Sequence, residues 1–258
     1  MARGRDVALA EAIPDLLDAG VVLIGERHSV LSHHIAQLKV IQALHEAGAD
    51  MAIGLEMIRN ENQSKLDRWI AGTLSEKELE TVFRENWNMP LELYRSIFDY
   101  AENERIPMVG LNISAEITAQ VSRYGFQSLT ADQRRRLPEI TCDVDQRYRK
   151  FIQRAYGVHA HGKMNFDAFC EAQLVWDHIM AVHILEYLRH HPNAVVVVLA
   201  GTAHVWKNGI PRQIRRRSDI KSVVLMPEPH HAGKSHPLTL DECDYLVKEV
   251  FSHPGSDK

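Results

Sequence analysis

Short apolar runs recur along the chain, and they constrain its fold more than any other feature. Each run is bounded by Gly, Pro or Asp, whereas the segments between the runs carry helical periodicity. Continuous apolar runs that alternate with helices are typical of strands buried in a parallel sheet. The sequence therefore predicts an α/β fold, with a parallel sheet flanked by helices on both faces. The predicted strands are Val21–Ile24, Met51–Leu55, Pro107–Leu111, Ala194–Leu199 and Ser222–Met226.

Two long segments interrupt this alternation without a strand-like run. Residues 61–104 are rich in charge and are predicted to form two helices separated by a turn at Met89-Pro90. Residues 130–163 begin with Thr130, which fits a helix N-cap. We expect both insertions to form a smaller helical subdomain within a single domain of residues 1–258. Further helices are predicted from Ser29 to Gly48 and over about residues 165–191.

Composition and charge argue against several classes of function. The 258 residues are 45% hydrophobic, as in an ordinary soluble globular protein, and the net charge is −4. A nucleic-acid partner is not expected, because phosphate binding needs a concentrated basic face. No run approaches the roughly 20 apolar residues of a membrane helix, and no apolar signal segment follows the amino terminus. We expect a cytoplasmic protein if Met1 is the natural start, and a bacterial-envelope protein if a leader has been removed.

Polar side chains follow four of the predicted strands. Glu26 and His28 come after the first strand, Glu56 after the second, Asn112 after the third and His204 after the fourth. The carboxyl ends of parallel strands meet at one edge of a sheet, so these side chains are predicted to converge. Carboxylates and imidazoles together can hold a divalent metal, act as acid and base, or form a network that fixes the loops. All three interpretations stay open from the residues alone.

Four polar residues on the predicted helices are further candidates for this polar edge of the sheet. Gln173 and Asp177 fall on or beside the apolar stripe of the helix over residues 165–191. A buried carboxylate is costly unless it is paired, so they are predicted either to join the polar edge or to face solvent beside a narrower stripe. His33 and His34 are interpreted first as part of a solvated turn and second as helpers to the Glu-Arg-His segment.

A second cluster of polar aromatic and imidazole groups lies in the later insertion. It comprises Tyr148, Tyr156, His159 and His161, with apolar side chains beside them. Haem needs an apolar slot and an axial donor, and both histidine nitrogen and tyrosinate oxygen serve as donors. The alternative is an amphipathic helix followed by an exposed His-rich loop.

In their order and spacing, the motifs resemble the ChaN haem-binding proteins of the Tiki, TraB and erythromycin-esterase-like group. The resemblance runs from Val21 to Ile214 through "VVLIGERHSVLSHHIAQ", "IGLEM", "YRSIFDYAENERIPMVGLN", "FCEAQLVWDHIMA" and "VVVVLAGTAHVWKNGIPRQI". It implies haem bound by a homodimer that places two haems face to face. It also implies a role in haem or iron uptake at the bacterial envelope, with haem-transport components as partners. Among the axial candidates we favour Tyr156 and the two histidines.

The same resemblance implies a second function. Tiki-type enzymes use residues matching Glu26, His28, Glu56 and His204 for metal-dependent hydrolysis. These four residues would then be ligands of a divalent metal ion and, together with Asp177, catalytic residues. The sequence therefore predicts a haem-binding protein first and a metal-dependent hydrolase second.

Overall fold

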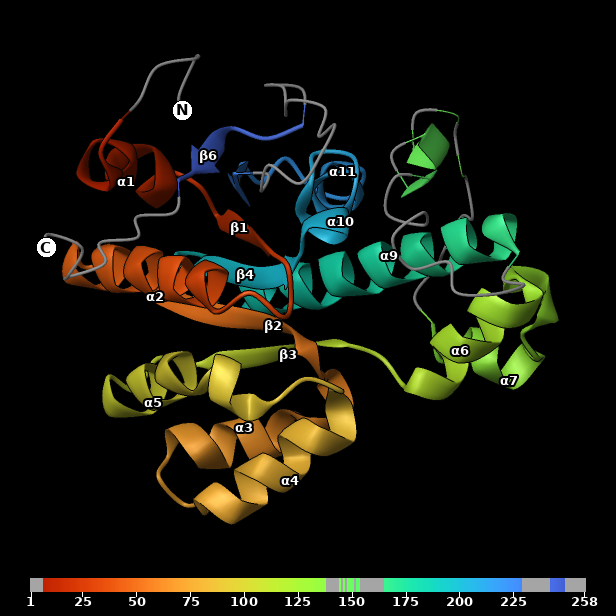
Figure 1. The fold of residues 1–258 in the computed structure, drawn as a ribbon, viewed down its shortest axis with the longest axis horizontal. Coiled ribbons are helices and arrows are strands. Elements are labelled where there is room, and N and C mark those ends of the chain that lie inside the picture. The colour runs from red at the N-terminus through yellow and green to blue at the C-terminus, as the bar shows by residue number, and fades with distance from the viewer. Residues whose placement is uncertain are drawn as a thin grey trace, which may run out of the picture.

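A single parallel sheet forms the centre of the molecule (Figure 1). The computed structural model describes residues 7–137, 144, 146, 148–150, 152–153, 165–228 and 242–248. Within them, six strands pair in the order β3-β2-β4-β1-β5-β6, and every pairing is parallel. The predicted α/β class is therefore confirmed. The strands are β1 Val21–Glu26, β2 Met51–Arg59, β3 Met108–Asn112, β4 Val195–Gly201, β5 Ser222–Pro227 and β6 Tyr245–Val247.

Five of these strands match the predicted apolar runs, and the differences lie at their ends. β2 extends four residues past Leu55, so that Glu56 lies inside the strand and not after it. β6 was not predicted, because it has only three half-buried residues and pairs with β5 at the edge of the sheet. A strand this short gives too few residues for a periodicity to be read.

Successive strand residues alternate between two apolar cores, one on each face of the sheet. Val22 and Ile24 of β1 belong to the core on one face, and Val21 and Leu23 to the core on the other. The first core is covered by α1 Leu9–Leu17, α2 Leu31–Glu46, α3 Gln63–Ile70, α4 Glu76–Asn86 and α5 Arg95–Asn103. The second is covered by α9 Phe166–His190, α10 Thr202–Val205 and α11 Ile210–Arg215. The helix α1 had no predicted counterpart.

A third, smaller apolar cluster joins the first half of α9 to the segment after β3. It packs α6 Ala115–Tyr124 and η4 Phe126–Ser128 against α9, and α7 Ala131–Arg135 is joined to α6 by a hydrogen bond from Gln133 Nε2 to Gln120 Oε1 (Figure 1). Thr130 is the N-cap of α7, as predicted, and it forms a capping box with Gln133. Asn165 caps α9 by accepting a hydrogen bond from the backbone N–H of Asp167.

The earlier insertion contains three α-helices and not two. Met89 and Pro90 separate α4 from α5 as predicted, and the 3₁₀ turns η2 Asn60–Asn62 and η3 Leu91–Leu93 precede α3 and α5. The additional break falls between α3 and α4, where Gly72 has φ +67°. The helices α3 to α5 share the core of the sheet, whereas α6 packs in the third cluster. The single-domain assignment and the joint subdomain stay predictions.

No helix among the described residues combines the length and the apolar character needed to cross a membrane.

Candidate functional site

The carboxyl edge of the sheet brings together four of the five residues that the strand ends predicted: Glu26, His28, Glu56 and His204. Glu26 at the end of β1 pairs in register with Gly201 at the end of β4. His28 and Glu56 both border this glycine, because a Cβ atom at Gly201 would lie 2.9 Å from His28 Cε1 and 3.6 Å from Glu56 Oε2. His204 follows in α10, directly after β4. A side chain at position 201 would therefore clash with the site.

Glu26 is the centre of the first half of the site. It is 1% exposed, and its carboxylate accepts hydrogen bonds from the Tyr94 hydroxyl and, at 2.8 Å, from Gln37 Nε2. His28 Nδ1 lies 2.8 Å and His34 Nε2 3.5 Å from Glu26 Oε1. Burial alone would raise the pKa of Glu26, but the hydrogen bonds and charges of the two histidines hold it well below its usual range. Glu26 is therefore a carboxylate at neutral and moderately acidic pH.

His28 is the solvent-accessible member of this half, with a side chain that is 34% exposed. The ring of Trp87 contacts it edge-on, with 4.9 Å between the ring centroids. Burial opposes the charged imidazolium, but the hydrogen bond to Glu26 and the charge of Glu56 outweigh it and raise the pKa of His28. The partly exposed group of this half is therefore a histidine whose protonated form is favoured by its neighbours.

His33 and His34 do not form a solvated turn, so the first interpretation of them was wrong. They are 3% and 2% exposed, because α2 begins at Leu31 and its first turn faces the sheet. His33 Nδ1 accepts a hydrogen bond from the backbone N–H of Arg27 at 2.9 Å, and His34 packs on Tyr94 with 4.2 Å between the ring centroids. His33 therefore stabilises the turn after β1, and His34 lies against the Glu26 group.

The second half of the site is a chain of hydrogen bonds centred on His204. His204 Nδ1 lies 2.7 Å from Asp177 Oδ1, and its Nε2 lies 3.4 Å from Glu56 Oε1. The Tyr148 hydroxyl donates to Asp177 Oδ2 at 2.9 Å, and the backbone N–H of Gly201 donates to Glu56 Oε2 at 2.6 Å. All four side chains are buried. Asp177 thus joins the polar edge from α9, which is one of the two outcomes predicted for it.

The charges in this half differ from those around Glu26. Burial raises the pKa of Asp177 even though His204 and Tyr148 both hydrogen-bond to it. Burial opposes the charge on His204, but the charge of Glu56 and the bond to Asp177 outweigh that effect and raise the pKa of His204 above its usual value. At neutral pH His204 is therefore an imidazolium held between two carboxylates.

The placed side chains do not fit the predicted metal centre. No group of three or more His, Cys, Asp or Glu side chains in the described part of the chain is arranged to hold a metal ion. The carboxylate oxygens of Glu26 face Tyr94, Gln37 and His28, and Glu56 Oε2 accepts the bond from the backbone of Gly201. As placed, the Glu26 carboxylate and Glu56 Oε2 are engaged with the protein's own donors.

Two predicted polar residues have other positions. The side-chain N–H of Asn112 donates to the backbone oxygen of Glu56 at 2.8 Å and so links β3 to β2. Gln173 is buried on α9, one turn before Asp177, and is 7% exposed.

The predicted haem ligands are only partly within the described residues. Tyr148 is fully buried, and its hydroxyl donates to Asp177. Burial and the charge of Asp177 raise the pKa of Tyr148 well above its usual value, which opposes a tyrosinate ligand at this position. Tyr156, His159 and His161 lie outside the described residues.

Sequence reasoning missed Gln37 and Tyr94, which bind Glu26. For Gln37 a signal existed, because positions 33, 37, 40, 41 and 44 share one helical face. Apolar periodicity predicts that Leu31 and Ile35 lie on one buried stripe of this helix with Ile41 and Leu44, but they are 51% and 47% exposed. The buried face of the first turns is polar, so apolar periodicity alone misplaced it. For Tyr94 we find no sequence signal, since it lies 68 positions from Glu26.

Comparison with known proteins identifies the family. Residues 12–214 match the family described as "Haem-binding uptake, Tiki superfamily, ChaN". The chain belongs to the ChaN family. This confirms the resemblance drawn from the motifs. No protein of curated function matches the sequence.

Solved structures share the fold at low sequence identity. ChaN of Campylobacter jejuni, solved with cofacial haem, is 21% identical over 95% of this chain and 92% of its own, with a TM-score of 0.74. The type III effector HopBA1 is 12% identical over 96% of both chains, with a TM-score of 0.54. An erythromycin esterase in its open conformation is 16% identical over 84% of this chain and 72% of its own, with a TM-score of 0.53. At these identities the likeness establishes the fold alone.

Proposed function

We propose that this protein binds haem, and that it takes part in haem or iron uptake. The observation that carries the proposal is the family match over residues 12–214, which spans both halves of the polar site and the insertion with the candidate ligands. The ChaN structure from Campylobacter jejuni, which shares the fold, holds its haems cofacially. By analogy, two protomers of this chain would cover two stacked haems. Haem binding and dimerisation would then be coupled by mass action.

The axial donor to the haem iron is a residue in the second half of the later insertion, residues 130–163. Tyr148 is the weaker candidate, because an iron bond would require its hydroxyl to leave Asp177 and become accessible. Tyr156, His159 and His161 follow it along the chain and supply both kinds of oxygen and nitrogen donor used with haem. Ile152 and Phe166, on either side of this segment, pack against the core around α9.

Haem absorption spectra of ligand variants test this assignment. We expect Tyr156→Phe, or the double change His159→Ala with His161→Ala, to shift the Soret band of the bound haem. Tyr124→Phe is the matched control, since Tyr124 is 73% exposed on α6 and is expected to leave the spectrum unchanged. Identical spectra in the wild type and all of these variants would remove Tyr156 and the two histidines as ligands.

Location and transport partners belong to the same proposal. We propose that the protein hands haem to transport components, either in the cytoplasm or at the bacterial envelope. Fractionation of cells that express the native gene distinguishes the two locations. Haem transfer to a purified membrane fraction tests for a partner there.

We propose a hydrolase as the second candidate, because His204 is held between Glu56 and Asp177. An imidazolium oriented by a carboxylate can donate a proton to a leaving group. Glu56, 3.4 Å from His204, is the group placed to accept a proton from an attacking water. This form of the proposal needs no metal ion, and the placed side chains do not fit one.

Hydrolysis of 4-nitrophenyl acetate, together with metal analysis, tests this candidate. We expect activity that is lost in Glu56→Gln and His204→Gln, and that falls as the pH rises through the raised pKa of His204. Equal rates in the wild type and both variants would exclude it. A stoichiometric divalent metal in protein purified without added metal, lost in His204→Ala, would instead favour the metal-dependent form.

A further inference from the structure

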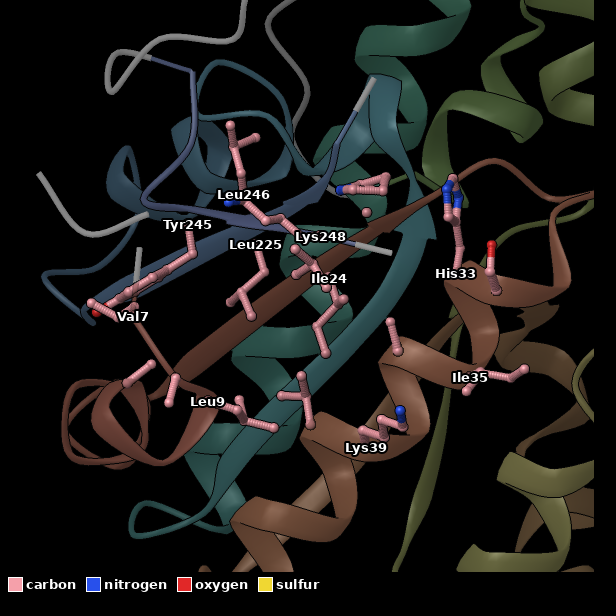
Figure 2. A pocket seen from close by; sticks show the side chains of 18 residues that line it. Val7, Leu9, Ile24, His33, Ile35, Lys39, Leu225, Tyr245, Leu246 and Lys248 are labelled. Carbon is pink, nitrogen blue, oxygen red and sulfur yellow. The ribbon is translucent and has the colours of Figure 1, made fainter. Parts of the chain in front are cut away.

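A cavity of about 430 Å³ lies apart from the polar site, between α1, α2 and the carboxyl halves of β1, β5 and β6 (Figure 2). Ile24 and Leu225 line it from the sheet, Leu9 from α1 and Leu246 from β6. Its volume falls within the roughly 300–1,000 Å³ of small-molecule pockets. The molecule therefore has an apolar recess of ligand size that neither the haem proposal nor the hydrolase proposal uses.

The charged groups that line this cavity are all basic. Lys39 and Lys248 both line it, and none of the described lining residues is Asp or Glu. Figure 2 shows Lys39 on α2, on the opposite side of the cavity from Leu225 of the sheet. An anionic group beside Lys39 would thus meet positive charge and no carboxylate among the described lining residues.

Asp15, a carboxylate of α1, is already engaged with other groups. Asp15 pairs with Lys221 at 2.7 Å and accepts a hydrogen bond from the Tyr245 hydroxyl at 2.9 Å. Tyr245 therefore turns its hydroxyl to Asp15 and offers the cavity its ring. The apolar surface also continues outwards along α2, since Ile35 lines the cavity and is 47% exposed. An apolar chain entering the cavity would remove this surface from water.

We propose that the cavity binds a straight-chain fatty acid, with the hydrocarbon chain between α1, α2 and the sheet and the carboxylate beside Lys39. The ligand class follows from the two properties of the lining: an apolar interior and basic side chains without acidic ones. The proposal is independent of the haem proposal, because it uses different residues and a different ligand.

Calorimetric titration with sodium hexanoate, octanoate and decanoate, below their micellar concentrations, tests the proposal. Each added methylene is expected to strengthen binding by about fourfold until the cavity is filled. Octanol, which has the chain without the charge, is expected to bind more weakly than octanoate. Binding that does not depend on chain length, or that is equal for octanol and octanoate, would overturn the proposal.

Two variants with a matched control locate the site. Ala36 lines the cavity and is half-buried, so Ala36→Trp is expected to fill the space and abolish decanoate binding. Lys39→Glu is expected to weaken the binding of octanoate by about fivefold and to leave the binding of octanol unchanged. Lys77→Glu makes the same charge change at an exposed position of α4 and is expected to alter the binding of neither octanoate nor octanol.

Unchanged decanoate binding in a folded Ala36→Trp protein would overturn the proposal. So would full displacement of decanoate by one equivalent of haem, because the cavity would then belong to haem. A haem Soret shift in decanoate-saturated protein, equal to that without decanoate, supports two separate sites. Failure of the haem proposal alone appears as no Soret shift with decanoate binding intact.

Discussion

Glu26 and Asp177 are both buried carboxylates at the same edge of the sheet, yet their pKa values move in opposite directions. The pKa of Glu26 is lowered, whereas that of Asp177 is raised. Glu26 faces α2 and has four side-chain partners, two of which are histidines. Asp177, on α9, has two partners in Tyr148 and His204.

The difference shows that burial alone does not set the charge of a carboxylate in this site. Burial is the largest effect on both groups and raises both pKa values. Around Glu26 the donors and positive charges exceed it, and around Asp177 they do not. Glu26 is thus a fixed anion that orders its surroundings, whereas Asp177 and His204 form the pair whose protonation can change near physiological conditions.

Neutralising each carboxylate in turn tests the difference between Glu26 and Asp177, and it is expected to have the largest effect on stability. Glu26→Gln is expected to cost about 3–5 kcal/mol of unfolding free energy, because it leaves buried donors and histidines without their counter-charge. Asp177→Asn is expected to cost only about 1–3 kcal/mol, since His204 keeps Glu56 as a counter-charge. Urea denaturation at pH 7 measures both. The exposed Glu80→Gln serves as control and is expected to change stability by no more than about 0.5 kcal/mol.

Equal losses in the two variants, or a larger loss in Asp177→Asn, would show that the two carboxylates do not differ as described.

The dependence of stability on alkaline pH tests the charge of His204, the partner of Asp177. The folded pKa of His204 is raised, so the stability it contributes is fully present below the unfolded value of about 6.5 and is lost as the pH rises through the folded pKa. The loss amounts to about 1.4 kcal/mol for each pKa unit of the shift. Unfolding free energies measured from pH 6 to 10 should fall less in His204→Gln than in the wild type. Parallel curves for the two proteins would contradict an imidazolium at this position.

Removing one tyrosine hydroxyl from beside Glu26 or Asp177 is expected to have the smallest effect on stability. Tyr94→Phe leaves Glu26 with Gln37 and the histidines, whereas Tyr148→Phe leaves Asp177 with His204 alone. Both variants are expected to be destabilised, and Tyr148→Phe by about 1 kcal/mol more. Thermal unfolding of the two variants side by side measures the difference. A larger loss in Tyr94→Phe would mean that the hydroxyl, and not the histidines, dominates at Glu26.

The sequence allowed the sheet and the positions of the key acids and imidazoles to be predicted. Strand ends carry this information because buried parallel strands are locally apolar and their carboxyl ends meet in space. Glu26, His28, Glu56 and His204 were found in this way. Asp177 was found because a carboxylate on an apolar helical stripe requires a partner.

The remaining partners depend on tertiary packing that leaves no local pattern. Tyr94 reaches Glu26 from the start of α5, and only the packing of the earlier insertion against the sheet brings it there. The α2 stripe was misplaced because His33, His34 and Gln37 occupy its buried face while Leu31 and Ile35 are exposed. Hydrophobic periodicity fails at such a face, where polar side chains are buried around a charge.

Titration of the purified protein with haem, following the Soret band and the molecular mass together, decides whether this chain binds haem as a dimer. We expect a saturable spectral shift at one haem per chain, accompanied by conversion of monomer to dimer. A spectrum that stays that of free haem at every ratio would contradict haem binding.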